Sequence, residues 1–112
     1  MPTNPLLPLE TQRLILRRFR EDDLEDLYAY LSRPEVVKFE PYQPMNLEES
    51  KAELAARIES VEMIAVEEKA TGRLLGNLYL GKREFASMEL GYVFHDTYWH
   101  QGFAREGCEA LI

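Results

Sequence analysis

Three strand-like segments that follow one another with only short connections constrain this fold most. They are residues 62–69 (EMIAVEEK), 73–81 (RLLGNLYLG) and 87–95 (SMELGYVFH), each rich in apolar, β-branched or aromatic residues. Only residues 70–72 (ATG) separate the first two segments, a length that favours a hairpin. Consecutive strands joined by such short connections run antiparallel. The sequence therefore predicts an antiparallel meander.

Two amphipathic helices are predicted before this meander, after a strand at residues 13–19. The helix over residues 20–32 has four apolar residues at the spacing of one helical face: Leu24, Leu27, Tyr28 and Leu31. The helix over residues 47–60 is predicted to follow an Asn46 N-cap, with Glu49 as its capping-box partner. Its expected buried residues are Leu47, Leu54, Ala55 and Ile58. Helices combined with a meander indicate the mixed α+β class.

The composition excludes several classes of protein. The 112 residues include 20 acidic and 13 basic side chains, and the net charge of −7 disfavours binding to a nucleic-acid backbone. No apolar run approaches the length of a membrane span, and the first ten residues lack the pattern of a secretory signal. The one cysteine, Cys108, cannot form an internal disulfide and falls on an apolar helix face, so we expect a core residue in a cytoplasmic protein.

The segment from Gly91 to Gly107 (GYVFHDTYWHQGFAREG) combines the end of a strand, a short loop and the start of a helix. Backbone N–H groups at such a helix start have no helical partner and can bind phosphate. Gly102 and Ala104 are small enough to let the backbone approach a ligand closely. An ordinary loop-to-helix turn would contain the same residue types, so this segment by itself leaves both interpretations open.

The stretch YWHQGFARE at residues 98–106 resembles the acetyl-CoA-binding motif of the GNAT family of N-acetyltransferases. That motif, Q/R-x-x-G-x-G/A, falls on residues 99–104, with Trp99 in the first position. With Trp in the first position, the motif resembles that of the RimJ/RimL branch of the family, the ribosomal-protein N-acetyltransferases. Further similar segments lie at residues 9–36, 72–80 and 88–107. The resemblance implies a GNAT-like fold for residues 1–112, with an antiparallel-to-mixed central sheet flanked by helices.

The same resemblance implies that acetyl-CoA is the co-substrate. Backbone groups of the loop would hold its pyrophosphate, and those of the preceding strand would hold its pantetheine arm. The implied cofactor-binding residues are Val93, Phe94, Trp99, His100, Gln101, Gly102, Phe103, Ala104 and Arg105. Arg105 could equally be a surface residue. The acetyl group would pass by direct attack to a primary amine, either a protein N-terminus or a small molecule.

The attacking amine must first lose a proton, and members of the family often use a carboxylate for this step. Glu89, on the strand beside the implied thioester site, is the candidate catalytic base. The alternative is a solvent-facing residue or a partner of Arg17 or Arg18. His95 is a second and weaker candidate, because an unperturbed imidazole titrates near neutral pH. No further ligands stand at metal-binding spacing around it, so no metal is expected.

The acceptor site in this family is shaped in part by the connection between the first two helices. Here that connection is residues 36–45, where prolines accompany Phe39 and Tyr42. These two rings either line the acceptor pocket or cover the core.

The chain stops at Leu111-Ile112 inside the last predicted helix, without a capping residue. We therefore expect the N-terminal portion of a longer single N-acetyltransferase domain, and the resemblance places further strands and the general acid beyond residue 112. The edge of the last strand could then pair with a second copy to form a homodimer. The alternative function is a non-catalytic CoA-binding or dimerising interaction module.

Overall fold

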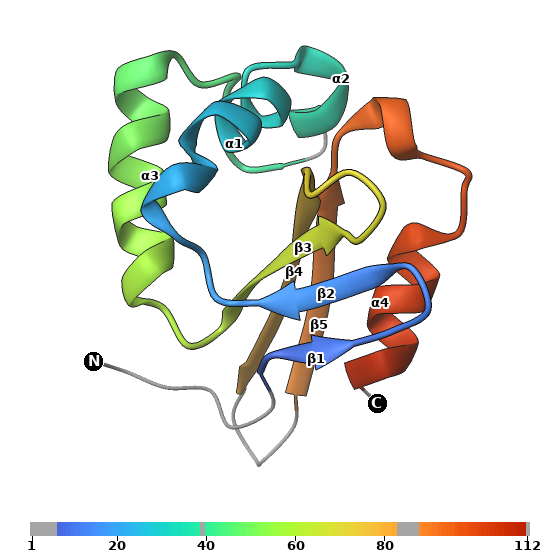
Figure 1. Cartoon of the computed structure of the whole chain (residues 1–112). Helices are drawn as coiled ribbons and strands as arrows, with labels where there is room; N and C mark the ends of the chain where they lie inside the picture. Colours follow the sequence, from blue (N-terminus) through green and yellow to red (C-terminus); the bar gives the residue numbers. More distant parts are fainter. Residues whose placement is uncertain (1–6, 39, 83–87, 112) are drawn as a thin grey trace.

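A five-stranded antiparallel sheet forms the centre of the protein in the computed structural model (Figure 1). The structure describes residues 7–38, 40–82 and 88–111, apart from the side chains of Lys82, Met88 and Glu89. The strands are β1 Leu9–Glu10, β2 Leu14–Arg17, β3 Met63–Glu68, β4 Leu74–Lys82 and β5 Met88–Phe94. They lie in the sheet in the same order as in the sequence. Strands β3, β4 and β5 form the predicted meander, and the mixed α+β class is confirmed.

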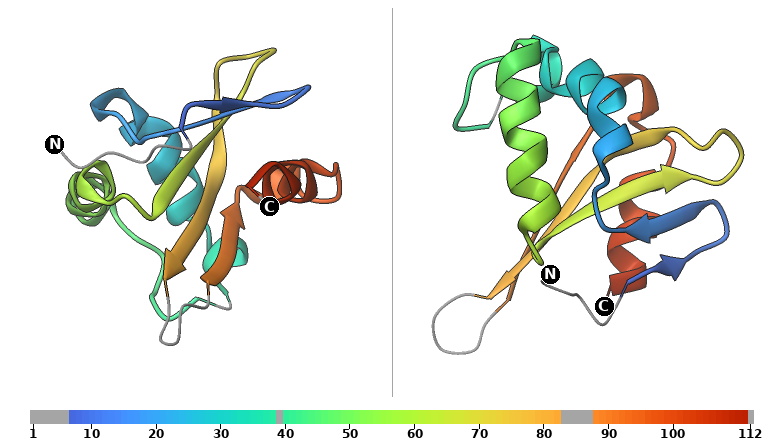
Figure 2. Two further views of the ribbon diagram at one scale, coloured as in Figure 1. Left: turned by 90° about the horizontal axis from the view of Figure 1, so that it is seen from below. Right: turned by 60° about the vertical axis from the view of Figure 1, so that its left-hand side comes forward.

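Helices cover both faces of this sheet (Figure 2). Helices α1 (Leu24–Leu31), α2 (Pro34–Val37) and α3 (Leu47–Glu59) pack on one face, and α4 (Phe103–Leu111) packs on the other. Strand β3 supplies both cores, because Ala65 belongs to the cluster under α1 and α3 while Ile64 belongs to the cluster under α4. None of the described helices is both long enough and apolar enough to cross a membrane.

The last residues of β5, just before the turn and loop that lead to α4, approach the start of β4 very closely. Gly76 of β4 is paired with Phe94 of β5. A Cβ atom on Gly76 would lie 2.3 Å from the carbonyl oxygen of Val93. Only glycine therefore allows the last residues of β5 to take this position.

The buried face of α1 differs from the prediction. Tyr28 is 37% exposed, whereas Tyr30 is fully buried beside Leu27 and Leu31. The hydroxyl group of Tyr30 donates a hydrogen bond to Oδ1 of Asn77 on β4 at 2.8 Å. This polar partner inside the sheet allows a tyrosine to be buried at a position outside the predicted apolar face.

The buried face of α3 also differs from the prediction, although its start is confirmed. The side chain of Asn46 accepts the N–H of Glu49 at 2.8 Å, and Glu49 accepts the N–H of Asn46 at 3.0 Å, which completes the capping box. Leu47 and Ala55 are exposed, and Ile58 is only half-buried. The residues of α3 that face the core are Ser50, Leu54 and Arg57. The physical reason is again a set of distant polar partners, which Arg57 reaches in Tyr30 and Asn77.

The connection between α1 and α3 contains the short helix α2, which the sequence did not predict. Pro34 stands in the first turn of α2, where its missing N–H costs nothing. Val36 and Val37, the last two residues of α2, are buried in the core, and the following loop leads to Asn46. Phe39, in the same connection, lies outside the described residues.

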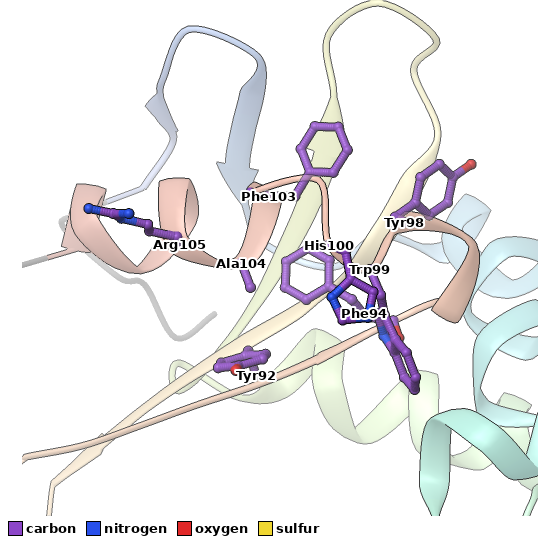
Figure 3. Close-up of a pocket in the computed structure, with 9 residues that line it drawn as sticks. Tyr92, Phe94, Tyr98, Trp99, His100, Phe103, Ala104 and Arg105 are labelled. Carbon is purple, nitrogen blue, oxygen red and sulfur yellow. The ribbon is translucent and has the colours of Figure 1, made fainter.

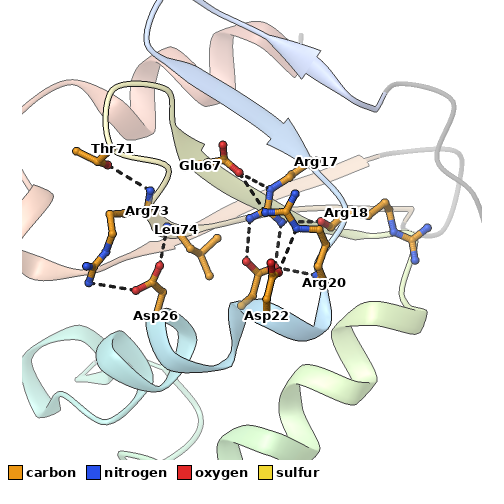
Figure 4. Close-up of polar contacts among 10 residues, drawn as sticks. Arg17, Arg18, Arg20, Asp22, Asp26, Glu67, Thr71, Arg73 and Leu74 are labelled. Carbon is orange, nitrogen blue, oxygen red and sulfur yellow. Dashed lines mark hydrogen bonds and ion pairs between the residues drawn. The ribbon is translucent and has the colours of Figure 1, made fainter.

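A buried ion-pair network joins β2, β3 and the turn before α1 (Figure 4). Two guanidinium nitrogens of Arg17 donate to the carboxylate of Asp23 at 2.9 and 2.8 Å, and its Nε donates to Glu67 at 2.9 Å. Arg17 and Asp23 are both largely excluded from water. Losing one partner of such a buried pair leaves an uncompensated charge. Arg17 is thus held by carboxylates from the turn before α1 and from β3.

Candidate functional site

A pocket opens where β5 ends and α4 begins (Figure 3). Between the two elements lie a 3-10 turn at Asp96–Tyr98 and a loop at residues 99–102. The pocket, called here the loop pocket, has a volume of about 460 Å³. Its lining residues are Tyr92, Phe94, Tyr98, Trp99, His100, Gly102, Phe103, Ala104 and Arg105. Most of this lining is aromatic, and the first residues of α4 form one side of it.

The backbone of the loop presents several N–H groups at one place. His100 and Gly102 both have positive φ, 64° and 82°. The N–H of Glu106 donates to the carbonyl of Gly102 at 2.9 Å, so Gly102 is the N-cap of α4. The N–H groups of Gly102 and of the next three residues consequently have no partner within the helix. Together with the helix dipole they form an anion-binding geometry.

Three hydrogen bonds hold the loop against the end of β5. The indole N–H of Trp99 donates to the carbonyl of Phe94 at 2.8 Å, and the side-chain amide of Gln101 donates to the carbonyl of Thr97 at 3.0 Å. The N–H of Tyr98 closes the turn by donating to the carbonyl of His95 at 2.9 Å. The side chain of Gln101 is therefore turned back onto the loop, away from the lining of the loop pocket.

Most of the residues implied by the resemblance come together, with two exceptions and two additions. Gln101 and Val93 do not line the loop pocket, while seven of the nine implied cofactor residues do. Tyr92 and Tyr98 line it without having been predicted. Tyr92 could have been found from the sequence, because it lies two residues before Phe94 and therefore on the same face of the strand. The rings of Tyr92 and Phe94 meet edge to face, with centroids 6.2 Å apart.

A second, smaller pocket lies on the other side of Phe94 and Trp99. This pocket, called here the side pocket, has a volume of about 190 Å³. It is lined by Glu35, Val36, Glu40, Tyr92, Val93, Phe94 and Trp99. The two pockets share Tyr92, Phe94 and Trp99, so they adjoin along β5. The two carboxylates of the side pocket give it negative charge.

The candidate base, Glu89, and the tyrosine of the predicted acceptor loop, Tyr42, lie on different elements of the fold. Glu89 lies on β5 opposite Gly81 of β4, and its side chain is outside the described part of the structure. Tyr42 is half-buried and lines a separate pocket of about 480 Å³ against α3. Burial raises the pKa of Tyr42 above its ordinary value. The structure thus places Tyr42 with α3 and not with β5.

His95 stands at the end of β5 and caps the turn that follows. Its Nδ1 accepts the N–H of Thr97 at 3.1 Å. Burial lowers the pKa of His95, and the nearby Asp96 carboxylate opposes that shift in part. Asp96 itself accepts a hydrogen bond from Arg33 at 2.9 Å, and this bond lowers its pKa. The Arg33–Asp96 pair ties the turn to the start of α2.

No cluster of three or more potential metal ligands occurs among the residues that the structure places. Cys108 is half-buried at the margin of the core under α4, and burial raises the pKa of its thiol.

Comparison with known protein families identifies the family to which a chain with this fold and this loop pocket belongs. The acetyltransferase (GNAT) domain matches residues 13–112. The chain belongs to the GNAT acetyltransferase family. The uncharacterised N-acetyltransferase YnaD of Bacillus subtilis is 28% identical over 109 residues. That alignment covers 93% of this chain and 62% of YnaD.

Solved structures agree with the GNAT fold. A GNAT-family acetyltransferase from Bacillus anthracis superposes with a TM-score of 0.86 at 24% identity, covering 92% of this chain and 62% of that protein. A candidate ribosomal-protein-serine acetyltransferase from Vibrio cholerae superposes with a TM-score of 0.79 at 26% identity, covering 96% and 66%. This GNAT chain therefore spans about two thirds of the length of these relatives, or slightly less.

Proposed function

We propose that the protein is an acetyl-CoA-dependent N-acetyltransferase that transfers an acetyl group to a primary amine. The observation that carries this proposal is the group of N–H groups at the start of α4 that have no partner within the helix, next to an aromatic pocket at the end of β5. An anion site beside an apolar pocket matches a ligand that joins phosphates to a long, mostly uncharged arm.

The residues of the loop pocket fit acetyl-CoA in two parts. The N–H groups of Gly102, Phe103, Ala104 and Arg105 would bind the pyrophosphate. The rings of Tyr92 and Phe94 would flank the pantetheine arm, and the outer backbone edge of β5 near Val93 would bind its amides. When bound, acetyl-CoA supplies an acetyl group activated as a thioester. Backbone N–H groups directed at the thioester oxygen would stabilise the negative charge that develops there.

The side pocket suits the acceptor. Glu35 and Glu40 would attract an ammonium group, and the pocket adjoins the loop pocket along Phe94 and Trp99. Protein N-termini and small amines both meet this requirement. The name of the Vibrio cholerae relative, a candidate ribosomal-protein-serine acetyltransferase, is a reason to include protein N-termini. A protein with one cysteine suits a reducing compartment, and we place the reaction in the cytoplasm.

Glu89 is the proposed base, which would take the proton that the ammonium group must lose before attack. We expect Glu89→Gln to lower kcat/KM by about a hundredfold or more while leaving CoA affinity unchanged, since only the proton transfer is removed. The measurement is initial rate against pH with a panel of amines. Glu48→Gln, an exposed carboxylate on α3, is the matched control. An unchanged rate profile for Glu89→Gln would eliminate Glu89 as the base.

The decisive test of the loop pocket compares two glycines that have similar backbone strain when substituted. Gly102 and Gly72 have φ of 82° and 73°. A β-branched residue is disfavoured at both positions by about 1–2 kcal/mol. We expect Gly102→Val to weaken CoA binding by about tenfold or more, because relieving the strain turns the N–H groups away. Gly72→Val, in the turn between β3 and β4, should bind CoA as the unsubstituted protein does.

Isothermal titration calorimetry measures the CoA affinity of both variants. Thermal unfolding checks that the two substitutions lower the stability by similar amounts. Equal CoA affinity in Gly102→Val and Gly72→Val would show that the loop does not hold the cofactor. CoA binding without acetyl transfer to any amine would mean that the protein is a binding module instead of an enzyme.

A further inference from the structure

Arg13, in the turn between β1 and β2, contacts the loop before α4 from a distant part of the sequence. Its Nη1 donates to the carbonyl of Gln101 at 3.1 Å, and its Nε donates to Glu106 at 2.6 Å. The guanidinium group also lies over the ring of Phe103, 4.2 Å from its centroid. One side chain thus contacts the loop and the first turn of α4 in three ways.

The bond to Gln101 determines which way the next N–H points. The carbonyl of Gln101 and the N–H of Gly102 belong to the same peptide group, and in a trans peptide they point in opposite directions. Because Arg13 holds the carbonyl, the N–H of Gly102 is directed away from Arg13. A flip of this peptide would rotate ψ of Gln101 and φ of Gly102, and glycine makes the second rotation easy. The contact with Arg13 opposes that flip.

The bond to Glu106 removes an electrostatic conflict. Glu106 lies in the first turn of α4, where its carboxylate would repel a phosphate or compete with it for the free N–H groups. Instead the carboxylate accepts the Nε of Arg13, the backbone N–H of Arg13 at 2.9 Å, and the hydroxyl of Thr11. Burial opposes ionisation of Glu106, but these bonds outweigh it and lower its pKa. The negative charge is thereby held on the side of the β1–β2 turn.

We infer that Arg13 is a positioning residue for CoA: it orients the Gly102 N–H toward the bound pyrophosphate by holding the Gln101 carbonyl, while it neutralises Glu106. This inference rests on the proposed function. Arg13 acts through its geometry and not by supplying charge to the phosphates. Arg13→Lys separates these two roles, because an ammonium group keeps the charge but lacks the planar fork that reaches Gln101 and Glu106 at once.

The test measures CoA affinity by titration calorimetry and follows the backbone amide of Gly102 by NMR, in the free protein and with CoA. We expect Arg13→Gln to weaken CoA binding by about tenfold or more, and to shift or broaden the Gly102 amide even without CoA. We expect Arg13→Lys to do the same. Arg20→Gln removes the same charge from an exposed arginine far from the loop, and should change affinity by no more than about twofold.

Two outcomes would overturn the inference. One is wild-type CoA affinity with an unchanged Gly102 amide in Arg13→Gln, and the other is full restoration of affinity by Arg13→Lys, which would assign Arg13 a purely electrostatic role. If Arg13→Gln does not stay folded, Arg13→Lys carries the comparison, since it retains a charge beside Glu106. Absence of CoA binding by the unsubstituted protein would refute the proposed function, and the amide of the free variants would still test the positioning role.

Discussion

His95 is the residue whose charge state most directly affects the turn between β5 and the loop. Because its Nδ1 accepts the N–H of Thr97, the neutral ring carries its proton on Nε2. Protonation of Nδ1 would replace this acceptor with a donor and break the cap. The positive charges of Arg33 and Arg73 also disfavour protonation of His95. The folded protein therefore holds His95 neutral at a pH where an unfolded chain would protonate it.

This lowered pKa gives stability a defined pH dependence. The unfolded chain binds the proton below a pH of about 6.5, and the folded protein binds it only at lower pH, so stability falls as the pH decreases through 6.5. We expect His95→Asn, which keeps an acceptor for Thr97 but does not titrate, to remove this loss. Urea unfolding at pH 7.5, 6.5 and 5.5 measures it. An identical loss in both proteins would exclude His95 as its source.

The carboxylates near the site act in a separate and more acidic range. The pKa of Asp96 is lowered by its hydrogen bond from Arg33, and that of Glu106 is lowered by Thr11 and Arg13 against the effect of burial. Their contributions to stability are present above their ordinary pKa values and are lost as the pH falls through the lowered ones. The effect of His95 can therefore be measured before these groups begin to titrate.

At the scale of elements, α1 and α3 are joined to the sheet by a buried polar network. Arg57 of α3 is 3% exposed, and its Nη1 donates to Tyr30 of α1 and to Asn77 of β4, both at 2.9 Å. Its Nε donates to Glu53 one turn earlier at 2.7 Å. Burial raises the pKa of Tyr30, so the phenol keeps its proton and remains a donor to Asn77. Three elements are thus held in one relative arrangement.

We expect Arg57→Met to destabilise the protein by about 3 kcal/mol, because Glu53, Tyr30 and Asn77 lose a shared buried partner. Lys51→Met is the matched control on the same helix, since Lys51 pairs only with the exposed Glu48 in the described contacts. That control should cost no more than about 1 kcal/mol. Denaturant unfolding compares the two. Similar losses in both variants would mean that the network adds nothing beyond helix propensity.

At the scale of the whole molecule, the cores on the two faces of the sheet differ in composition. The face under α1 and α3 holds a core with charged and polar members, while the core under α4 is made of apolar and aromatic residues. The loop pocket and the side pocket meet at β5, which contributes to both. The N-terminal hairpin crosses to the same region, because β2 packs against α4 (Figure 1). The candidate site therefore depends on segments from both ends of the sequence.

The sequence by itself determined the features that depend on near neighbours along the chain. The meander follows from strand patterns separated by short turns, and the Asn46–Glu49 capping box involves residues three positions apart. The loop-to-helix start at Gly102 is likewise local, as the positive φ of that glycine indicates. These features could be predicted because the groups that stabilise them lie within one turn of each other.

Only the tertiary structure decided which side chains meet across the fold. Tyr30 rather than Tyr28 is buried, and Arg57 faces the core, because both hydrogen-bond to Asn77 on β4, a strand far along the sequence. Arg13 reaches Glu106 across 93 positions, and no local pattern connects them. Periodicity reports which residues share a face, but it contains no information about the polar partner that the face will meet. That partner is supplied by chain segments brought together only when the sheet forms.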